Sequence, residues 1–365
     1  MSFGPRGDDD RDVIVTEVGT RDGFQAEAAF IPTEVKAEIV DALVDAGVRS
    51  IEATSFVSPR AIPQLADAHA MLERVTRRDG LRIAALVPNA RGAERAAAAK
   101  VDMMVCFVSA SESHCRANLN KPVAAALADV AEFAPIAARF GIPVRGAVAT
   151  AFGCPFEGDV PVDALLRIVD AYRALGVRHV TLGDTTGMAV PPVVERAVDA
   201  IARRFPDVAL ALHFHNTRGV GLANAMLGLQ MGVREYEASI GGLGGCPFAP
   251  GATGNVCTED LVYLLEESGF DTGIDLAALI DVAHSVEALV GRTLPGQVMK
   301  AGPRLRRYSL EGARRAASSG ESFSRGTAFI TWPGSVRPTT RSTRCATAIS
   351  RSRSMPVRKP DSCSR

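Results

Sequence analysis

Two short segments, far apart in the sequence, carry residue types that bind metal ions and transfer protons. One is Thr20-Arg21-Asp22-Gly23, near the start of the chain, and the other is His213-Phe214-His215. Side chains alternate with a period of two along a strand, so an extended His-x-His segment places both imidazoles on one face. Two imidazoles, with an aspartate and an asparagine arriving from elsewhere, would form a mixed nitrogen and oxygen site for a divalent cation.

A glycine-rich segment follows the His-x-His segment. It reads Gly241-Gly242-Leu243-Gly244-Gly245-Cys246-Pro247, and Gly254-Asn255 comes shortly after it. Glycines allow the backbone to fold closely over a ligand. A cysteine in such a loop, beside two imidazoles, indicates a catalytic role. Cys246 and Asn255 are therefore candidates for the same site.

The elements that would position these segments alternate between strands and helices from residue 12 onwards. Apolar stretches predict eight strands, at residues 13–18, 49–53, 81–87, 101–108, 144–150, 177–182, 208–214 and 235–240. Amphipathic patterns predict eight helices, one from a Thr33 cap to Gly47 and the others at residues 63–74, 89–99, 122–140, 161–174, 191–204, 220–231 and 258–267. Eight strand–helix units are what an α/β fold of the (β/α)8 class, the TIM barrel, requires.

A doubly wound open sheet is the alternative for alternating strands and helices. Such a sheet seldom needs eight units, and it would carry a glycine-rich dinucleotide turn after its first strand, which this sequence lacks. After the barrel, residues 275–290 predict an extra helix, and residues 294–305 are expected to pack beneath it.

The C-terminal end differs in composition from the rest of the chain. The 365 residues have a formal net charge of zero and are 47% hydrophobic, as in a soluble globular protein. Residues 309–365, however, hold ten Arg and one Lys against three acidic residues, which gives about +8. This Ser-, Arg- and Pro-rich tail has too few apolar residues for a core, so we expect it to be disordered. A basic arm that binds nucleic acid or a partner is the alternative.

The expected organisation is therefore a flexible N-terminus (1–11), a catalytic barrel with a C-terminal helical segment (12–308) and the basic tail (309–365). The seven cysteines lack the close-paired spacing of a zinc cluster or disulfide framework, which favours free thiols in a reducing cytosol. No signal peptide precedes the barrel, and no apolar run approaches the ~20 residues of a membrane helix. We expect a cytoplasmic protein that binds neither membrane nor nucleic acid.

Polar residues at the carboxyl ends of the strands of a TIM barrel are typically catalytic, because these ends open on one mouth. The candidates, in chain order, are Arg21 and Asp22 after the first strand, Glu52 in the second, Asp184 after the sixth, His213 and His215 at the end of the seventh, and Cys246 and Asn255 after the eighth. Each also has a structural explanation. Asp22 could shape a turn, Asp184 could cap a loop, Glu52 could be a buried ion-pair partner and Cys246 a small core residue. The convergence of all eight on one end of a barrel favours the functional interpretation.

These segments resemble those of the 3-hydroxy-3-methylglutaryl-CoA lyases. The resemblance also rests on Ile51-Glu52-Ala53-Thr54-Ser55-Phe56-Val57-Ser58-Pro59 and Leu182-Gly183-Asp184-Thr185, and it covers about residues 12–305. Its most specific part is the segment that contains Cys246. The wider superfamily of metal-dependent barrels, which includes isopropylmalate and homocitrate synthases, shares the Arg-Asp and His-x-His segments but is not expected to share Gly-Gly-Cys-Pro.

The resemblance implies a Mg²⁺ or Mn²⁺ site whose ligands are Asp22, His213, His215 and Asn255. It implies that an acyl-CoA substrate, 3-hydroxy-3-methylglutaryl-CoA, is cleaved to acetyl-CoA and acetoacetate by metal-assisted retro-Claisen chemistry. The implied roles of the other residues are enolate stabilisation by Arg21, proton transfer by Cys246, orientation of ligands and water by Glu52 and Asp184, and shaping of the mouth by Asn118. We also expect a homodimer or a higher homo-oligomer.

Three positions depart from the family pattern. Ala28 stands where a Lys is often found, Asn216 where an Asp is frequent, and Ala147 where a Tyr is often found. These changes leave open a lyase for a longer branched 3-hydroxyglutaryl-CoA. A condensing synthase of the same superfamily is the other enzymatic alternative, and the Gly-Gly-Cys-Pro segment argues against it.

Overall fold

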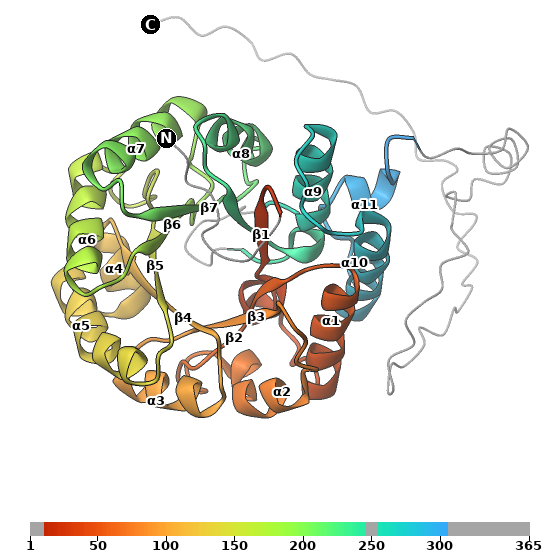
Figure 1. Cartoon of the computed structure of the whole chain (residues 1–365), viewed down its shortest axis with the longest axis horizontal. Coiled ribbons are helices and arrows are strands. Elements are labelled where there is room, and N and C mark those ends of the chain that lie inside the picture. The colour runs from red at the N-terminus through yellow and green to blue at the C-terminus, as the bar shows by residue number, and fades with distance from the viewer. Residues whose placement is uncertain (1–10, 246–253, 306–365) are drawn as a thin grey trace, which may run out of the picture. The chain divides into compact units, whose positions relative to one another are not determined.

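Eight parallel strands, paired in chain order, close into a barrel (Figure 1). The computed structural model describes residues 11–245 and 254–305, and the structural statements below concern these residues. Strand β1 pairs with both β2 and β8, which closes the ring. The strands are β1 (Ile14–Glu17), β2 (Ser50–Ser55), β3 (Arg82–Leu86), β4 (Met103–Ser109), β5 (Val144–Ala149), β6 (His179–Gly183), β7 (Ala209–His213) and β8 (Glu235–Ala238). The predicted TIM barrel is confirmed.

Helices cover the outside of the barrel and separate consecutive strands, as Figure 1 shows. They are α1 (Thr33–Asp45), α2 (Ala68–Arg74), α3 (Ala90–Ala98), α4 (Glu112–Leu119), α5 (Val123–Arg139), α6 (Val162–Ala174), α7 (Pro191–Arg204), α8 (Gly221–Gln230) and α9 (Thr258–Glu267). The extra C-terminal segment is present as α10 (Leu276–Val290) and α11 (Val298–Ala301). None of the described helices is long and apolar enough to cross a membrane.

One local prediction was wrong, and one helix was missed. Thr33 does not cap the first helix: Pro32 occupies the N-cap position without a side-chain hydrogen bond, and Thr33 is the first helical residue. Helix α4 was not predicted, because it is short and its exposed face is polar. Its start is nevertheless marked by Ser111, whose hydroxyl accepts a hydrogen bond from the backbone N–H of His114 at 3.1 Å.

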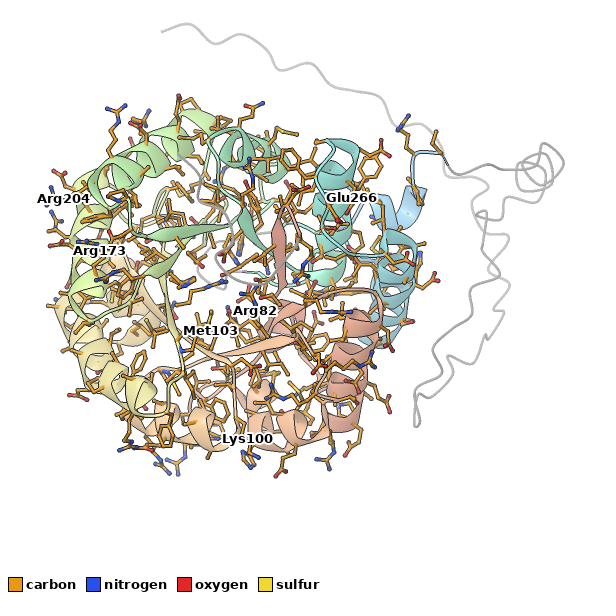
Figure 2. The ribbon with its side chains drawn as sticks, in the orientation of Figure 1. Arg82, Lys100, Met103, Arg173, Arg204 and Glu266 are labelled. Atoms are coloured by element: carbon orange, nitrogen blue, oxygen red, sulfur yellow. The ribbon has the colours of Figure 1, made fainter. Side chains whose placement is uncertain are left out.

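The apolar core lies mainly between the strands and the helices, and the inside of the barrel is partly polar. Ala84, Leu86, Met103 and Val105 form a small separate apolar cluster. Figure 2 places Met103 and Arg82 toward the centre of the ring of strands, and Arg173 and Arg204 at its periphery. The barrel is therefore a packed scaffold whose interior also holds charged side chains.

The predicted flexible N-terminus and basic tail fall almost entirely outside the described residues, so those two predictions stand as they are. Residues 1–10 and 306–365 are not described, and neither is the segment 246–253 that contains Cys246.

Candidate metal centre

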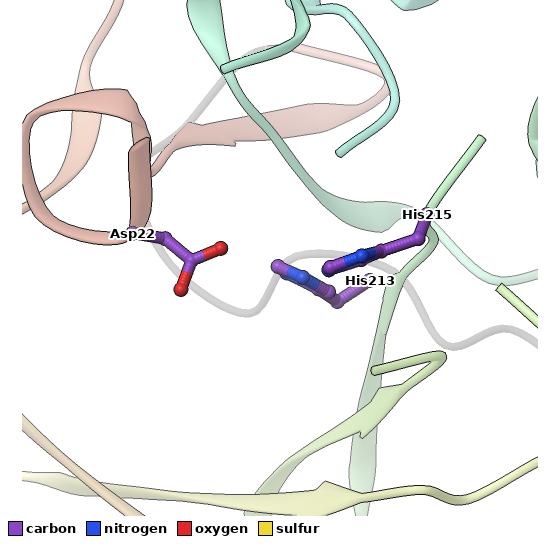
Figure 3. Close-up of side chains that lie close together, drawn as sticks. All are labelled: Asp22, His213 and His215. Carbon is purple, nitrogen blue, oxygen red and sulfur yellow. The ribbon is translucent and has the colours of Figure 1, made fainter. Parts of the chain in front are cut away.

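Three side chains from distant parts of the sequence meet at one end of the barrel. Asp22, His213 and His215 each offer one ligand atom, and these atoms lie within 4.8 Å of one another. Figure 3 shows the Asp22 carboxyl group pointing toward the two imidazole rings. The ring centroids of His213 and His215 are 5.3 Å apart. The predicted meeting of these two segments is therefore confirmed.

Each of the three side chains is positioned by a distinct piece of backbone. Asp22 lies in a π-helical turn, η1 (Gly19–Gly23), that directly follows β1. Such turns are rare and are frequent at functional sites. His213 is the last residue of β7, and His215 lies just beyond it in an isolated antiparallel bridge with Asn255.

Asn255 completes the donor set. Its Nδ2 donates hydrogen bonds to Asp22 Oδ2 at 2.8 Å and to the Leu243 carbonyl oxygen at 2.9 Å. Its Oδ1 is buried and has no hydrogen-bond partner among the described residues, as is also true of His215 Nδ1. A buried acceptor without a partner is costly, and a cation coordinated by Asn255 Oδ1 would remove that cost.

A glycine at position 244 is needed for this arrangement. Gly244 has a φ of +112°, which side-chain-bearing residues rarely adopt, and a Cβ atom there would lie 2.6 Å from Asn255 Nδ2. The glycine-rich segment thus brings its backbone against the amide that binds Asp22. This is the close backbone approach that the sequence predicted.

The electrostatics of the cluster suit a divalent cation. Burial alone would raise the pKa of Asp22, but Arg21, His213 and His215 together lower it to about 2, so the carboxyl group is ionised. Burial, reinforced by His213, lowers the pKa of His215 to about 3, which leaves a neutral imidazole. One carboxylate, two imidazoles and an amide oxygen form the donor set expected for a hard or borderline divalent ion.

Arg21 and Glu52 lie beside the metal ligands as an ion pair. Arg21 Nε is 2.5 Å from Glu52 Oε1, and Arg21 Nη1 donates to Asp22 Oδ1 at 2.5 Å. The pairing of β2 with β3 shifts register between Glu52 and Thr54, an irregularity of the kind often found next to functional sites. Burial raises the pKa of Glu52, and the neighbouring Arg21 offsets this only in part. The pair holds the guanidinium group at the mouth of the barrel.

Asp184 lies directly after β6 and binds its own loop. Its Oδ1 accepts hydrogen bonds from the backbone N–H groups of Met188 at 2.7 Å and Ala189 at 2.9 Å. Its Oδ2 is buried without a hydrogen-bond partner among the described residues. Burial raises the pKa of Asp184 to about 7. The loop-capping alternative is therefore correct for one oxygen, and the other oxygen is available to a ligand.

Two predicted residues are not brought into this cluster by any described contact. Asn118 lies exposed on α4, and no hydrogen bond among the described residues joins it to the candidate metal ligands. Cys246 lies outside the described residues, so its role in proton transfer stays a prediction.

The sequence did not predict a pair of buried carboxyl groups that hold the base of the glycine-rich segment. Glu17 accepts hydrogen bonds from the backbone N–H groups of Gly19 at 2.7 Å and Ile240 at 2.8 Å, and from the Thr258 hydroxyl at 2.5 Å. Glu259 accepts from the backbone N–H of Gly241 at 3.0 Å. We call Glu17, Thr258 and Glu259 the loop anchor. The sequence offered one signal for this pair, because Glu17 is a charged residue at the end of a mostly apolar strand.

The chain matches the family model described as HMGL-like over residues 12–286. A hydroxymethylglutaryl-CoA lyase of Bacillus subtilis is 42% identical over 285 residues, which cover 78% of this chain and 95% of the relative. An (R)-citramalyl-CoA lyase of Chloroflexus aurantiacus is also 42% identical, over 80% of this chain and 95% of the relative.

Solved structures give the same result. An HMG-CoA lyase from Acinetobacter baumannii, in complex with coenzyme A and 3-methylmalate, superposes with a TM-score of 0.78 and 42% identity, covering 82% of this chain and 97% of that one. The family model spans most of the chain, and the identity to its relatives is well above what a shared fold alone requires. The chain belongs to the HMGL-like family.

Proposed function

We propose that the protein is a divalent-metal-dependent carbon–carbon lyase that cleaves 3-hydroxy-3-methylglutaryl-CoA to acetyl-CoA and acetoacetate. The observation that carries this proposal is the convergence of Asp22, His213, His215 and Asn255 beside Arg21 at one end of the barrel. The family membership supports it, because relatives named as hydroxymethylglutaryl-CoA lyases match most of the chain.

Asp22, His213, His215 and Asn255 would hold the ion, which we propose to be Mg²⁺ or Mn²⁺. Such an ion supplies Lewis acidity, which makes a substrate hydroxyl group easier to deprotonate. The C3 hydroxyl proton would pass to water oriented by Glu52 and Asp184, and the oxygen would then form a carbonyl group while the C2–C3 bond breaks. The electron pair of the broken bond passes to the thioester and gives the enolate of acetyl-CoA.

Arg21 would stabilise the negative charge on the enolate oxygen. Its guanidinium group carries five N–H donors, and its contacts with Asp22 and Glu52 use Nη1 and Nε. The remaining N–H groups would be left for the thioester oxygen. Because donors fixed in place before the reaction need no reorganisation, they stabilise a developing charge most effectively.

Cys246 would protonate the enolate carbon and so complete the formation of acetyl-CoA. This role comes from the family resemblance. Gly244 and Gly245 lead directly into Cys246, and Gly244 lies against Asn255. Glu52 and Asp184 would orient Arg21, ligands and water, and Asn118 would contribute to the mouth of the site.

A second substrate, (R)-citramalyl-CoA, has support from one comparison and from the chain itself. A lyase named for that substrate is as similar to this chain as the Bacillus subtilis relative. Ala147, where the family often has a Tyr, packs against the apolar cluster inside the barrel. A smaller side chain at position 147 would leave more room for the acyl group. Ala28 and Asn216, which are close in sequence to site residues, would add to this change in acyl specificity.

Cleavage assays on a panel of 3-hydroxyacyl-CoA substrates test the assignment. We expect kcat/KM for 3-hydroxy-3-methylglutaryl-CoA to exceed that for citramalyl-CoA by ~10-fold or more, since small changes in acyl shape are typically worth that much. The opposite ranking would make citramalyl-CoA the substrate. Condensation of acetyl-CoA with a 2-oxoacid, without carbon–carbon cleavage of either acyl-CoA, would identify a synthase instead.

Assembly and location belong to the same proposal. We expect a homodimer or a higher homo-oligomer, which sedimentation velocity would measure, and a cytoplasmic location. Relatives named as cytoplasmic and as mitochondrial both occur among the similar proteins.

A further inference from the structure

Strand β8 carries a second pair of alternating polar residues, Glu235 and Glu237, beside the His-x-His segment of β7. The two strands pair in parallel, with Glu237 opposite His213 and Glu235 opposite Ala211. Because side chains alternate along a strand, Glu235 and Glu237 share the face that His213 uses. Both are buried, with 5% and 6% of their surface exposed. Two buried acids on one short strand require partners.

Glu237 makes a hydrogen bond to the ring of a metal ligand. Its Oε2 lies 3.0 Å from His213 Nδ1. Its other oxygen, Oε1, accepts from the Thr181 hydroxyl at 2.7 Å and from Arg145 Nη1 at 3.3 Å. Strands β5, β6 and β7 thus each contribute one partner, and the carboxyl group is held on both of its oxygens.

Arg145 links the two acids of β8. Its Nη2 donates to Glu235 Oε2 at 2.7 Å, while Nη1 donates to Glu237. One guanidinium group cannot neutralise two carboxylates. A net negative charge therefore remains on the group, and the Glu237 carboxylate faces His213 with it. The contacts run from Glu235 through Arg145 and Glu237 to His213.

We propose that Glu237 is a positioning residue for the metal ligand His213, and that Arg145 and Thr181 hold it in place. An ionised carboxylate can only accept hydrogen bonds, so His213 Nδ1 must carry the proton. The lone pair of His213 then lies on Nε2, which is left for the metal. A carboxylate that fixes the tautomer and the orientation of a ligating imidazole also makes that imidazole a better ligand.

This inference rests on the proposed metal site, and it is tested by metal affinity and by the state of the histidine ring. Purified full-length protein is stripped of metal, and Mn²⁺ binding is measured by titration calorimetry. Glu237→Gln, which keeps the size and removes the charge, should weaken Mn²⁺ binding by ~10–100-fold, the usual effect of losing such a partner. Glu237→Asp, which keeps the charge, should retain more affinity than Glu237→Gln.

Glu235→Gln is the matched control. It removes a carboxylate from the same arginine at nearly the same burial, but the hydrogen bond of Glu235 goes to Arg145 and not to the His213 ring. Its Mn²⁺ affinity should stay within ~3-fold of the wild type, because only a more distant charge changes. Equal weakening by both variants would overturn the proposal, since a general charge effect would then explain the loss.

The position of the proton on the His213 ring is measured by ¹⁵N NMR of metal-free protein with labelled histidines. In the wild type, at a pH where the His213 ring is neutral, the ring should carry its proton on Nδ1, and in Glu237→Gln that preference should be reduced. A neutral wild-type His213 ring that carries its proton on Nε2 would overturn the proposal even if no variant folds, as would wild-type Mn²⁺ affinity in folded Glu237→Gln. A wild type that binds no Mn²⁺ would instead overturn the metal site, and this inference with it.

Discussion

Two groups of buried acids near the mouth of the barrel differ in what faces them. In the first, Asp22 and Glu237 face Arg21, Arg145 and His213; we call these five residues the barrel cluster. In the second, the loop anchor, Glu17 and Glu259 face backbone N–H groups, a hydroxyl and a thiol. Glu237 is buried like Glu17 and Glu259, and Asp22 is largely buried, so the two groups differ mainly in their partners.

The consequence is opposite protonation. In the barrel cluster, burial opposes ionisation, but the cationic partners prevail and lower the pKa of both Asp22 and Glu237. In the loop anchor, burial prevails over the hydrogen bonds and raises the pKa of Glu17 to about 7 and that of Glu259 to about 8. The Asp22 carboxylate is thus ionised and available to a cation over a wide pH range, whereas the base of the glycine-rich segment depends on pH near neutrality.

The largest expected effect comes from removing a metal ligand from the barrel cluster. His213→Ala or Asp22→Ala should abolish cleavage, a fall of more than ~10⁴-fold, because Lewis-acid stabilisation is worth several kcal/mol and about 1.36 kcal/mol is tenfold. Bound metal measured by elemental analysis should fall with activity, while the melting temperature stays near that of the wild type. His69→Ala, at a half-exposed position paired with Glu73, is the control. If His213→Ala retained both metal and turnover, His213 would not be a metal ligand.

Cys246→Ser tests the glycine-rich segment that the loop anchor holds. A hydroxyl is a much weaker acid than a thiol, and general acid catalysis is typically worth ~10²–10⁴-fold. Turnover should therefore fall by that factor, while KM and metal content stay near wild type.

Alkylation provides the control for this variant. A thiol reagent should inactivate the wild type, with protection by substrate, and replacement of the buried Cys106, Cys115, Cys154 or Cys257 should not remove that sensitivity. Near-normal turnover in Cys246→Ser would reduce the cysteine to a packing residue.

The pH dependence of stability should separate the two groups of acids. Glu17 and Glu259 hold their protons more tightly in the folded protein than in the unfolded chain, whose ordinary value is 4.5. Their stabilising contribution is complete below that value and is lost as the pH rises through about 7 and about 8. The stability of Glu17→Gln relative to the wild type should therefore be higher at pH ~8 than at pH ~5.

Thermal melts of the two proteins across this range measure the effect. A difference of several degrees is expected, because 1 kcal/mol shifts the melting temperature of a domain of this size by roughly 2–4 °C. Glu73→Gln, on the exposed side of α2, should leave the pH profile unchanged. Parallel profiles for Glu17→Gln and the wild type would mean that Glu17 does not titrate in this range.

The smallest effect is expected outside both groups. A protein that ends at Tyr308 should keep the catalytic rate and the melting temperature of the full chain, because the composition of residues 309–365 predicts no packed structure. A melting temperature lower by several degrees, or a large loss of rate, would show that the tail packs on the barrel.

Much of this molecule could be predicted from the sequence, because the informative patterns are local. Buried apolar strands separated by amphipathic helices specify the barrel, and the barrel in turn brings the ends of β1 and β7 together. Asp22, His213 and His215 could be chosen on that basis, and the structure places them within reach of one ion.

The contacts that were missed depend on which strands are neighbours and in what register. Glu235 and Glu237 have the same two-residue spacing as the histidines, but only the pairing of β7 with β8 puts Glu237 opposite His213. Arg145 reaches both acids across the barrel from β5. Likewise, Glu17 and Glu259 are far apart in the sequence and meet because the glycine-rich segment returns over the end of β1.

Cleavage by this barrel should require a divalent ion held by Asp22, His213, His215 and Asn255, and removal and return of the metal measures that requirement. Cleavage of 3-hydroxy-3-methylglutaryl-CoA is measured on the purified protein as isolated, after chelation, and after addition of Mg²⁺ or Mn²⁺. We expect activity to vanish with the metal and to return when either ion is restored. Full activity in the presence of chelator, with no bound divalent ion detected, would contradict the account.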